Sequence, residues 1–197
     1  MNKIQALSQI VTEVNDLTDS PLYSYRKENG YYPVPGEGDP EARLLFIGEA
    51  PGKLEAETGR PFVGRAGKDL DGLLEANGLE RKEVFITNIV KDRPPGNRAP
   101  TKAEIKLYAV FLIRQIEIIQ PKVIATLGRY SMEFMLTHFD LPEKHEKIGA
   151  LHGQPLSALS FYGNVILFPL YHPAAIFYNR KLEPELAADF AKLVSLL

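Results

Sequence analysis

Apolar residues along the chain follow two spacings, which alternate from one end to the other. Residues 2–16 are predicted as a helix because five apolar side chains share one face: Ile4, Leu7, Ile10, Val11 and Val14. Short continuous apolar runs, typical of strands buried on both faces, occur at residues 43–48, 83–90, 121–128 and 163–170. Helical spacing occupies the segments between and after them, at residues 65–80, 101–120, 129–139 and 183–197.

Strands that alternate with helices favour a sheet whose strands run mainly parallel. We therefore predict an α/β protein, a three-layer α/β/α arrangement around a central, mainly parallel four-stranded sheet. The length suits a single domain, residues 1–197. Ligands of such sheets bind beyond the carboxyl ends of the strands. The loops expected to meet there are unusually rich in glycine, proline and polar residues: 48–52, 91–98, 126–129 and 171–175.

Residues that start and stop helices refine this picture. Thr101 and Glu104 have the spacing of a capping box, which predicts a helix that opens just after Thr101. Gly78 is placed to end the helix of residues 65–80. Residues 17–42, rich in proline, glycine and tyrosine, are predicted as a long loop.

Composition excludes several kinds of site. The absence of cysteine rules out disulfides and thiolate metal ligands, and the four histidines lack a metal-binding spacing, so no metal site is predicted. The net charge of −2 neither favours nor opposes DNA binding, because a local basic face is sufficient for an enzyme that contacts few phosphates. With no apolar run of membrane-spanning length and no signal peptide, we expect a cytoplasmic protein.

Three side chains at strand ends or in connecting segments could recognise a planar polar ligand. Phe62 could stack on a base, although core packing is the commoner role of a single phenylalanine. Asn88 could read a base edge with its donor and acceptor, or cap a turn. His172 could donate a hydrogen bond to a leaving oxyanion, or be a satisfied structural histidine.

The order of the motifs is more specific than any one of them. The chain contains GEAPG, GRPFVGRAG, ITNIVKDRPPGNR, LG and YHPAA in that sequence. This series strongly resembles the family-four uracil-DNA glycosylases, from about Leu17 to the C-terminus. The resemblance implies a monofunctional base excision repair enzyme, expected to be a monomer, that hydrolyses the N-glycosidic bond of uracil in DNA. It also implies that the nucleotide is flipped out of the duplex.

The resemblance assigns roles to individual pocket residues. It implies that Phe62 stacks on uracil, that Asn88 bonds the pyrimidine edge and that His172 bonds O2 as charge develops. Glu55 resembles the residue beside C5 that obstructs the methyl group of thymine.

We expect a second group of residues to lie around the reacting sugar and the DNA backbone. Glu49 and Asn97 are candidates for placing the attacking water, and Ala50 stands where a better-known branch of the superfamily has an aspartate. The basic side chains predicted to contact DNA are Lys91, Arg93, Arg98, Arg180 and Lys181.

The chain departs from the family at the cofactor. Relatives normally hold a [4Fe–4S] cluster with four cysteines, and a cluster needs thiolate ligands. The corresponding positions here are Leu17, Ser20, Asp92 and Tyr108. We predict that no cluster binds, and that side-chain packing or hydrogen bonds organise the same region.

Two alternatives remain open at this stage. The enzyme could act on another deaminated or mispaired base, such as hypoxanthine or a mispaired pyrimidine. It could instead be a catalytically silent DNA-binding relative.

Overall fold

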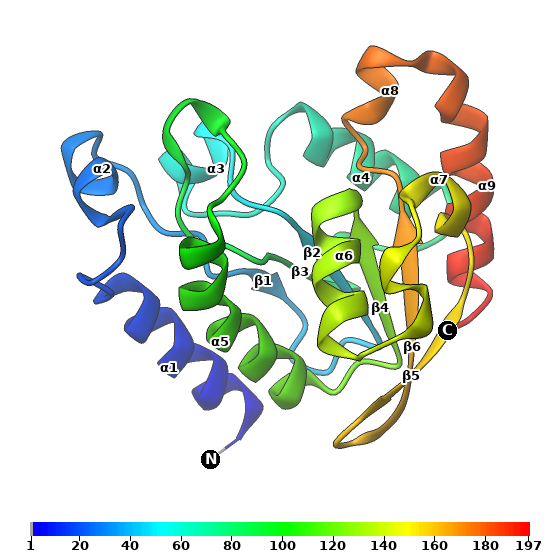
Figure 1. Ribbon diagram of the computed structural model, residues 1–197, viewed down its shortest axis with the longest axis horizontal. Coiled ribbons are helices and arrows are strands. Elements are labelled where there is room, and N and C mark those ends of the chain that lie inside the picture. The colour runs from blue at the N-terminus through cyan, green and yellow to red at the C-terminus, as the bar shows by residue number, and fades with distance from the viewer. Residues whose placement is uncertain (1) are drawn as a thin grey trace.

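The computed structural model describes residues 2–197, and within them the strands form one six-stranded sheet (Figure 1). The strand order is β1-β3-β2-β4-β6-β5. The bounds are β1 Glu37–Gly38, β2 Leu44–Gly48, β3 Phe85–Asn88, β4 Val123–Leu127, β5 Leu156–Ser160 and β6 Gly163–Leu170. The central strands β3, β2, β4 and β6 are parallel, as predicted. Two short antiparallel edge strands, β1 and β5, were not predicted.

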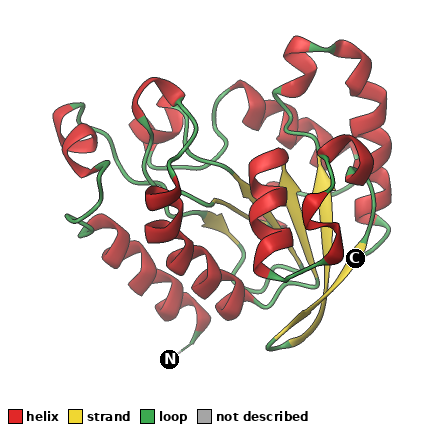
Figure 2. Cartoon of the chain, viewed as in Figure 1, coloured by secondary structure: helices red, strands yellow, loops and turns green. Residues whose placement is uncertain are grey.

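Helices cover both faces of the sheet (Figure 2). Their bounds are α1 Lys3–Asn15, α2 Tyr23–Glu28, α3 Lys53–Thr58, α4 Arg65–Ala76, α5 Lys102–Ile119, α6 Arg129–His138, α7 Ile148–Leu151, α8 Ala175–Tyr178 and α9 Glu183–Val194. Short 3-10 helices lie at Arg81–Glu83, Pro95–Asn97, Pro142–His145 and Arg180–Leu182. The predicted three-layer architecture is therefore correct.

The alternation of side chains along β2 shows why two helical layers are needed. Leu45 and Ile47 enter the apolar cluster that includes residues of α1, α5 and α6. Leu44 and Phe46 enter a second cluster with residues of α4 and α9 on the opposite face. All four side chains are almost completely buried, so a continuous apolar run supplies both cores at once.

The predicted start of one helix is confirmed, the predicted end of another is displaced by one residue, and one predicted loop is partly wrong. The capping box of Thr101 and Glu104 forms in both directions and opens α5. Helix α4 ends at Ala76 with Asn77 as its cap, one residue before the predicted Gly78, which follows in the left-handed region. The predicted loop of residues 17–42 is wrong in part, because it contains α2 and β1.

The segments that follow β2, β3, β4 and β6 lie at one edge of the sheet, the upper edge in Figure 1. These segments are α3 with the turn before it, the loop of residues 91–98, the start of α6, and α8 with the turn before it. No helix within residues 2–197 has the length and apolar character needed to cross a membrane.

Candidate active site

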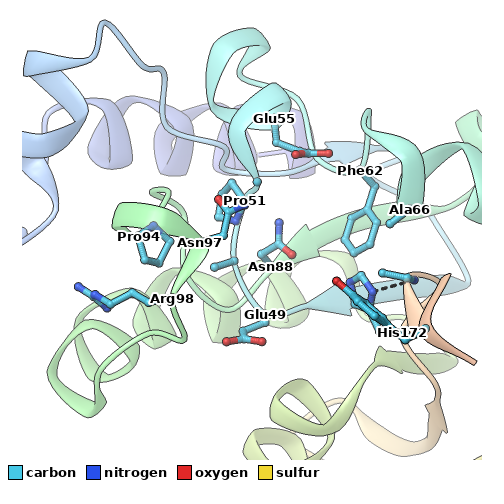
Figure 3. A pocket seen from close by; sticks show the side chains of 14 residues that line it. Glu49, Pro51, Glu55, Phe62, Ala66, Asn88, Pro94, Asn97, Arg98 and His172 are labelled. Carbon is cyan, nitrogen blue, oxygen red and sulfur yellow. Dashed lines mark hydrogen bonds between the residues drawn. The ribbon is translucent and has the colours of Figure 1, made fainter. Parts of the chain in front are cut away.

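A pocket of about 480 Å³ opens at this edge (Figure 3). In Figure 3, Phe62 and His172 form one side, Pro94, Asn97 and Arg98 form the other, and Asn88 lies between them. The full lining comprises Glu49, Ala50, Pro51, Gly52, Glu55, Phe62, Ala66, Asn88, Pro94, Asn97, Arg98, His172, Ala174 and Tyr178. The fold thus brings together every residue that the sequence predicted for catalysis or base binding.

Phe62 is held on a strained stretch of backbone. Its φ of +48° lies in the left-handed region, which is unusual for an aromatic residue. Gly67 on α4 makes this possible, since a Cβ there would overlap the carbonyl of Phe62. The Glu55 carboxylate accepts hydrogen bonds from the backbone N–H groups of Val63 and Gly64 at 3.0 and 2.8 Å. These contacts fix the ring at the pocket wall.

Arg81 secures the same loop from outside the pocket. Its guanidinium donates to the carbonyl oxygens of Pro61 and Phe62 and forms ion pairs with Glu37 and Asp71. The sequence contained no sign of this support, because Arg81 lies about twenty residues away along the chain.

Asn88 ends β3 with a buried amide whose oxygen has no hydrogen-bond partner in the protein. The residue is 2% exposed, and its Oδ1 is unsatisfied. Gly48 at the end of neighbouring β2 allows this close packing, because a Cβ there would overlap the amide and come within 2.7 Å of the Phe62 ring. A buried polar atom without a partner is costly, which favours a role in binding a ligand.

His172 is fixed in one tautomer. The backbone N–H of Ala174 donates to its Nδ1 at 3.1 Å, so the proton of the neutral ring lies on Nε2. Burial lowers the pKa of His172 to about 4, although the charge of Glu55 opposes the shift. Its ring centroid lies 5.7 Å from that of Phe62. At neutral pH the site therefore holds a neutral imidazole with one N–H available.

Glu49 and Asn97 both line the pocket. Burial raises the pKa of Glu49, with the positive charge of Arg129 opposing the shift. The side-chain oxygen of Asn97 accepts a hydrogen bond of 2.7 Å from Nε of Arg93. Asn97 itself has a positive φ of +55°, a backbone conformation that asparagine adopts more readily than most residues. Ala50 contributes only a small apolar surface to the lining.

The predicted DNA contacts fall into two groups. Arg98, Arg180 and Lys181 are exposed and free to approach a backbone, although Arg98 also pairs with Glu104 at 2.7 Å. Arg93 is half-buried, and its guanidinium bonds Tyr31 as well as Asn97.

Lys91 was predicted wrongly as a DNA contact, because its side chain is completely buried. Its ammonium donates to Oγ1 of Thr87, the carbonyl of Asn88 and Oε1 of Gln115 at 2.6–2.8 Å. Lys91 therefore supports the chain beneath Asn88. A single sequence could not distinguish this lysine from its exposed neighbours.

Tyr178 is the main pocket residue that sequence reasoning did not single out. It lies at the end of α8 on the rim of the pocket, and it is 91% exposed. It belongs to residues 176–181, just after His172, where a mix of apolar and basic side chains beside the predicted pocket was the only available signal.

The four positions that correspond to the family's cluster ligands do not suit an iron–sulfur cluster. Ser20, Asp92 and Tyr108 meet in a buried hydrogen-bonded group, and Leu17 packs against the apolar core. Hydroxyl, carboxylate and isobutyl groups do not provide thiolates. Within residues 2–197, no cluster of three histidine or carboxylate side chains is arranged to hold a metal ion.

The amino-acid sequence is similar to those of known uracil-DNA glycosylases. A sequence model of the uracil DNA glycosylase superfamily matches residues 35–195. A type-4 uracil-DNA glycosylase of Sulfurisphaera tokodaii is 43% identical over 96% of this chain and 84% of its own length. Another, from Archaeoglobus fulgidus, is 38% identical over 96% of this chain and 92% of its own length. A type-5 uracil-DNA glycosylase of Thermus thermophilus is 39% identical over 55% of this chain and 56% of its own length. This chain belongs to the uracil-DNA glycosylase superfamily.

Proposed function

We propose that this protein removes uracil from DNA by hydrolysing the N-glycosidic bond, leaving an abasic site. The observation that carries the proposal is the convergence of an aromatic wall, an unsatisfied buried amide and a neutral histidine in one pocket. Relatives named type-4 uracil-DNA glycosylases over nearly the whole chain support the same reaction.

Base recognition would come from Phe62 and Asn88. A uracil ring stacked on Phe62 brings its N3–H and O4 edge toward the amide of Asn88. The amide can accept from N3–H and donate to O4, and this pairing satisfies the buried oxygen that has no partner in the free protein. Cytosine presents the opposite pattern at this edge, so an amide held in this orientation pairs with uracil and not with cytosine.

Bond cleavage would depend on His172. As the C1′–N1 bond breaks, negative charge develops on uracil and positive charge on the sugar. The Nε2–H of a neutral imidazole can donate a hydrogen bond to O2 as that charge grows, and Nδ1 remains occupied by the N–H of Ala174.

Water attack would use the opposite side of the pocket. Glu49 has a raised pKa, which brings a carboxylate closer to the proton affinity of an effective general base. The water adds to C1′ and gives up a proton, while the departing uracil anion is protonated from solvent. Asn97 can accept or donate one hydrogen bond to the same water.

Glu55 would limit the base range. Its carboxylate is fixed by Val63 and Gly64 at the pocket wall, where a rigid group can obstruct a substituent on C5 of the base. We propose that this wall excludes thymine. DNA contacts would come from Arg98, Arg180 and Lys181.

We also propose that the enzyme works without an iron–sulfur cluster, as a cytoplasmic monomer. The absence of any cysteine and the occupation of the ligand positions by other chemistry support the first point. A monomer would suffice for the reaction, because one chain supplies every residue predicted for catalysis and base binding. Stoichiometric iron with broad visible absorption in freshly purified protein would contradict the cluster-free assignment, and sedimentation measures the oligomeric state.

Cleavage of labelled oligonucleotides tests the reaction directly. Strands that carry uracil, hypoxanthine or a thymine mispair are incubated with the protein and then treated with alkali, which breaks the strand at abasic sites. We expect a product from uracil alone. Cleavage of hypoxanthine or mispaired strands in preference would assign another base, and DNA binding without any abasic product would assign a binding protein.

A further inference from the structure

A buried polar group lies below the loop of residues 93–98. Ser20, Arg26, Asp92 and Tyr108 are each at most 6% exposed, and they come from four separate segments of the chain. The hydroxyl oxygens of Ser20 and Tyr108 are 2.6 Å apart, Tyr108 donates to Oδ2 of Asp92, and Nη1 of Arg26 lies 3.2 Å from Oδ1 of Asp92. We call these four residues the polar staple.

The hydrogen bonds of the polar staple run in one direction. Tyr108 has a single hydroxyl proton and donates it to Asp92, so Ser20 donates to the oxygen of Tyr108. The N–H of Leu22 in turn donates to the Ser20 oxygen at 3.0 Å. Each hydroxyl thus donates once and accepts once, a satisfied arrangement in which the bonds polarise one another.

Arg26 connects the polar staple to the end of α1. Its guanidinium donates to the carbonyls of Val14 and Asn15 at 3.2 and 3.0 Å, at the C-terminal end of the helix, which carries a partial negative charge. The positive charge of Arg26 is therefore compensated by Asp92 on one side and by the helix end on the other. Arg26, on α2, thus links the end of α1 to the segment that follows β3.

Asp92 also directly precedes the loop of residues 93–98, which forms one wall of the pocket. Its neighbour Lys91 is fixed beneath Asn88, and its other neighbour Arg93 donates to the side chains of Tyr31 and Asn97. Buried Pro94 begins the wall itself. A rigid anchor at Asp92 therefore determines where Arg93 lies, and Arg93 holds the amide of Asn97 at the pocket.

We propose that the polar staple performs the structural work for which relatives of this kind use a metal cluster, and that Asp92 is a positioning residue that acts on the reaction through Arg93 and Asn97. The second part rests on the proposed uracil excision. The first part concerns folding alone and is independent of it.

Asp92→Asn is the central test. The variant keeps the shape of the side chain but leaves the guanidinium of Arg26 buried without its carboxylate. We expect the melting temperature to fall by roughly 6–20 °C, measured by circular dichroism. Removing the Arg26 charge as well, in Asp92→Asn/Arg26→Gln, should recover part of that loss. The control is Glu41→Gln, the same chemical change in the exposed ion pair with Lys3, which should shift the melting temperature by less than about 4 °C.

Tyr108→Phe provides a milder variant that retains the aromatic ring in the core. It leaves Ser20 and Asp92 each with one unmatched group, and the melting temperature should fall by roughly 2–12 °C. If neither Asp92→Asn nor Tyr108→Phe lowers the melting temperature more than Glu41→Gln does, the polar staple has no structural role and the first part is wrong.

Single-turnover uracil release tests the positioning role, at a temperature where every variant is folded. Asp92→Asn should slow release at saturating DNA by roughly 10–100-fold, with affinity for the DNA changed far less. In an Asn97→Ala background the same substitution should slow release little further, because the two residues act in series.

Three outcomes would each overturn the positioning role: additive losses in the double variant, an Asn97→Ala variant at wild-type rate, or an Asp92→Asn variant that releases uracil normally. A wild-type protein without any uracil release would refute the proposed function and with it the positioning role, while the melting data would still decide the structural part.

Discussion

Single atoms define the chemistry of this pocket. The tautomer of His172 is set by one backbone N–H, that of Ala174, and the ligand preference of Asn88 is set by one buried oxygen without a partner. The residue type alone predicts neither the tautomer of His172 nor the unpaired oxygen of Asn88, since histidine and asparagine each offer a donor and an acceptor.

The pH dependence of uracil release should reflect a neutral His172. Since burial lowers its pKa to about 4, the imidazole is already neutral at pH 6, and no loss of rate from His172 is expected between pH 8 and pH 5. As pH falls through about 4, the ring gains a proton that the buried site disfavours, and release should slow. Single-turnover rates from pH 3.5 to 8 measure this. The raised pKa of Glu49 can move the profile as well, so the same series is measured on Glu49→Gln. A decline centred near pH 6.5 that persists in Glu49→Gln would mean that the histidine is not desolvated.

The same shift carries a consequence for stability. The unfolded chain binds a proton at His172 below about pH 6.5, whereas the folded protein binds it only below about pH 4, so this group makes stability fall as pH falls through that window. The His172→Gln variant lacks this contribution. Its melting temperature should therefore decline less than that of the wild type between pH 6.5 and 4.

Replacement of Asn88 should separate function from stability. Because Oδ1 of Asn88 has no partner in the free protein, Asn88→Ala removes a buried unsatisfied group, which offsets the cost of the small cavity. We expect a melting temperature within about 4 °C of the wild type and a loss of release of roughly 100-fold or more. A large loss of stability together with a normal rate would show that the amide is structural.

Short connecting segments at the element scale position these atoms. The loop from α3 to α4 keeps Phe62 at a positive φ because Gly67 leaves room for its carbonyl, Glu55 accepts from the following N–H groups, and Arg81 donates to its oxygen. The strain of one residue is thus compensated by contacts from three elements.

Two glycines of α4 offer a matched test of that loop. Gly67→Ala places a Cβ against the Phe62 backbone, so we expect a marked loss of stability and of uracil release. Gly72→Ala, five residues along the same helix, meets open space and should stabilise the protein by about 0.5–1 kcal/mol with release unchanged. Thermal melts and single-turnover assays on the two variants decide the point; equal behaviour would show that Gly67 has no special role.

At the scale of the whole molecule, a net charge of −2 leaves DNA binding to local features. Around the pocket these are the exposed basic residues Arg98, Arg180 and Lys181, together with the exposed ring of Tyr178 on the rim. An aromatic group at that position is suited to fill the space that a flipped base leaves in a duplex.

Tyr178→Ala should therefore distinguish duplex from single strand. We expect slower uracil release from double-stranded DNA, by roughly 10-fold or more, and a much smaller effect on single-stranded DNA, where little stacking must be replaced. Phe161→Ala, at a similarly exposed aromatic residue on the β5–β6 turn, is the control and should leave both rates unchanged. Equal losses on the two substrates would assign Tyr178 to base binding.

The sequence by itself determined the layers, the parallel centre of the sheet and the loops that form the pocket, because apolar periodicity and glycine-rich strand ends reflect local physics. It missed the edge strand β1, whose two residues are too short to produce a pattern, and α2, which is a single turn and a half within a proline-rich segment. Only the tertiary structure decided which charged side chains are buried. Lys91, Arg93 and Arg98 look alike in one basic loop, yet Lys91 lies beneath Asn88 and Arg98 reaches the surface. Burial and pairing depend on partners far apart in the chain, such as Gln115 for Lys91 and Arg26 for Asp92, and no local pattern carries that information.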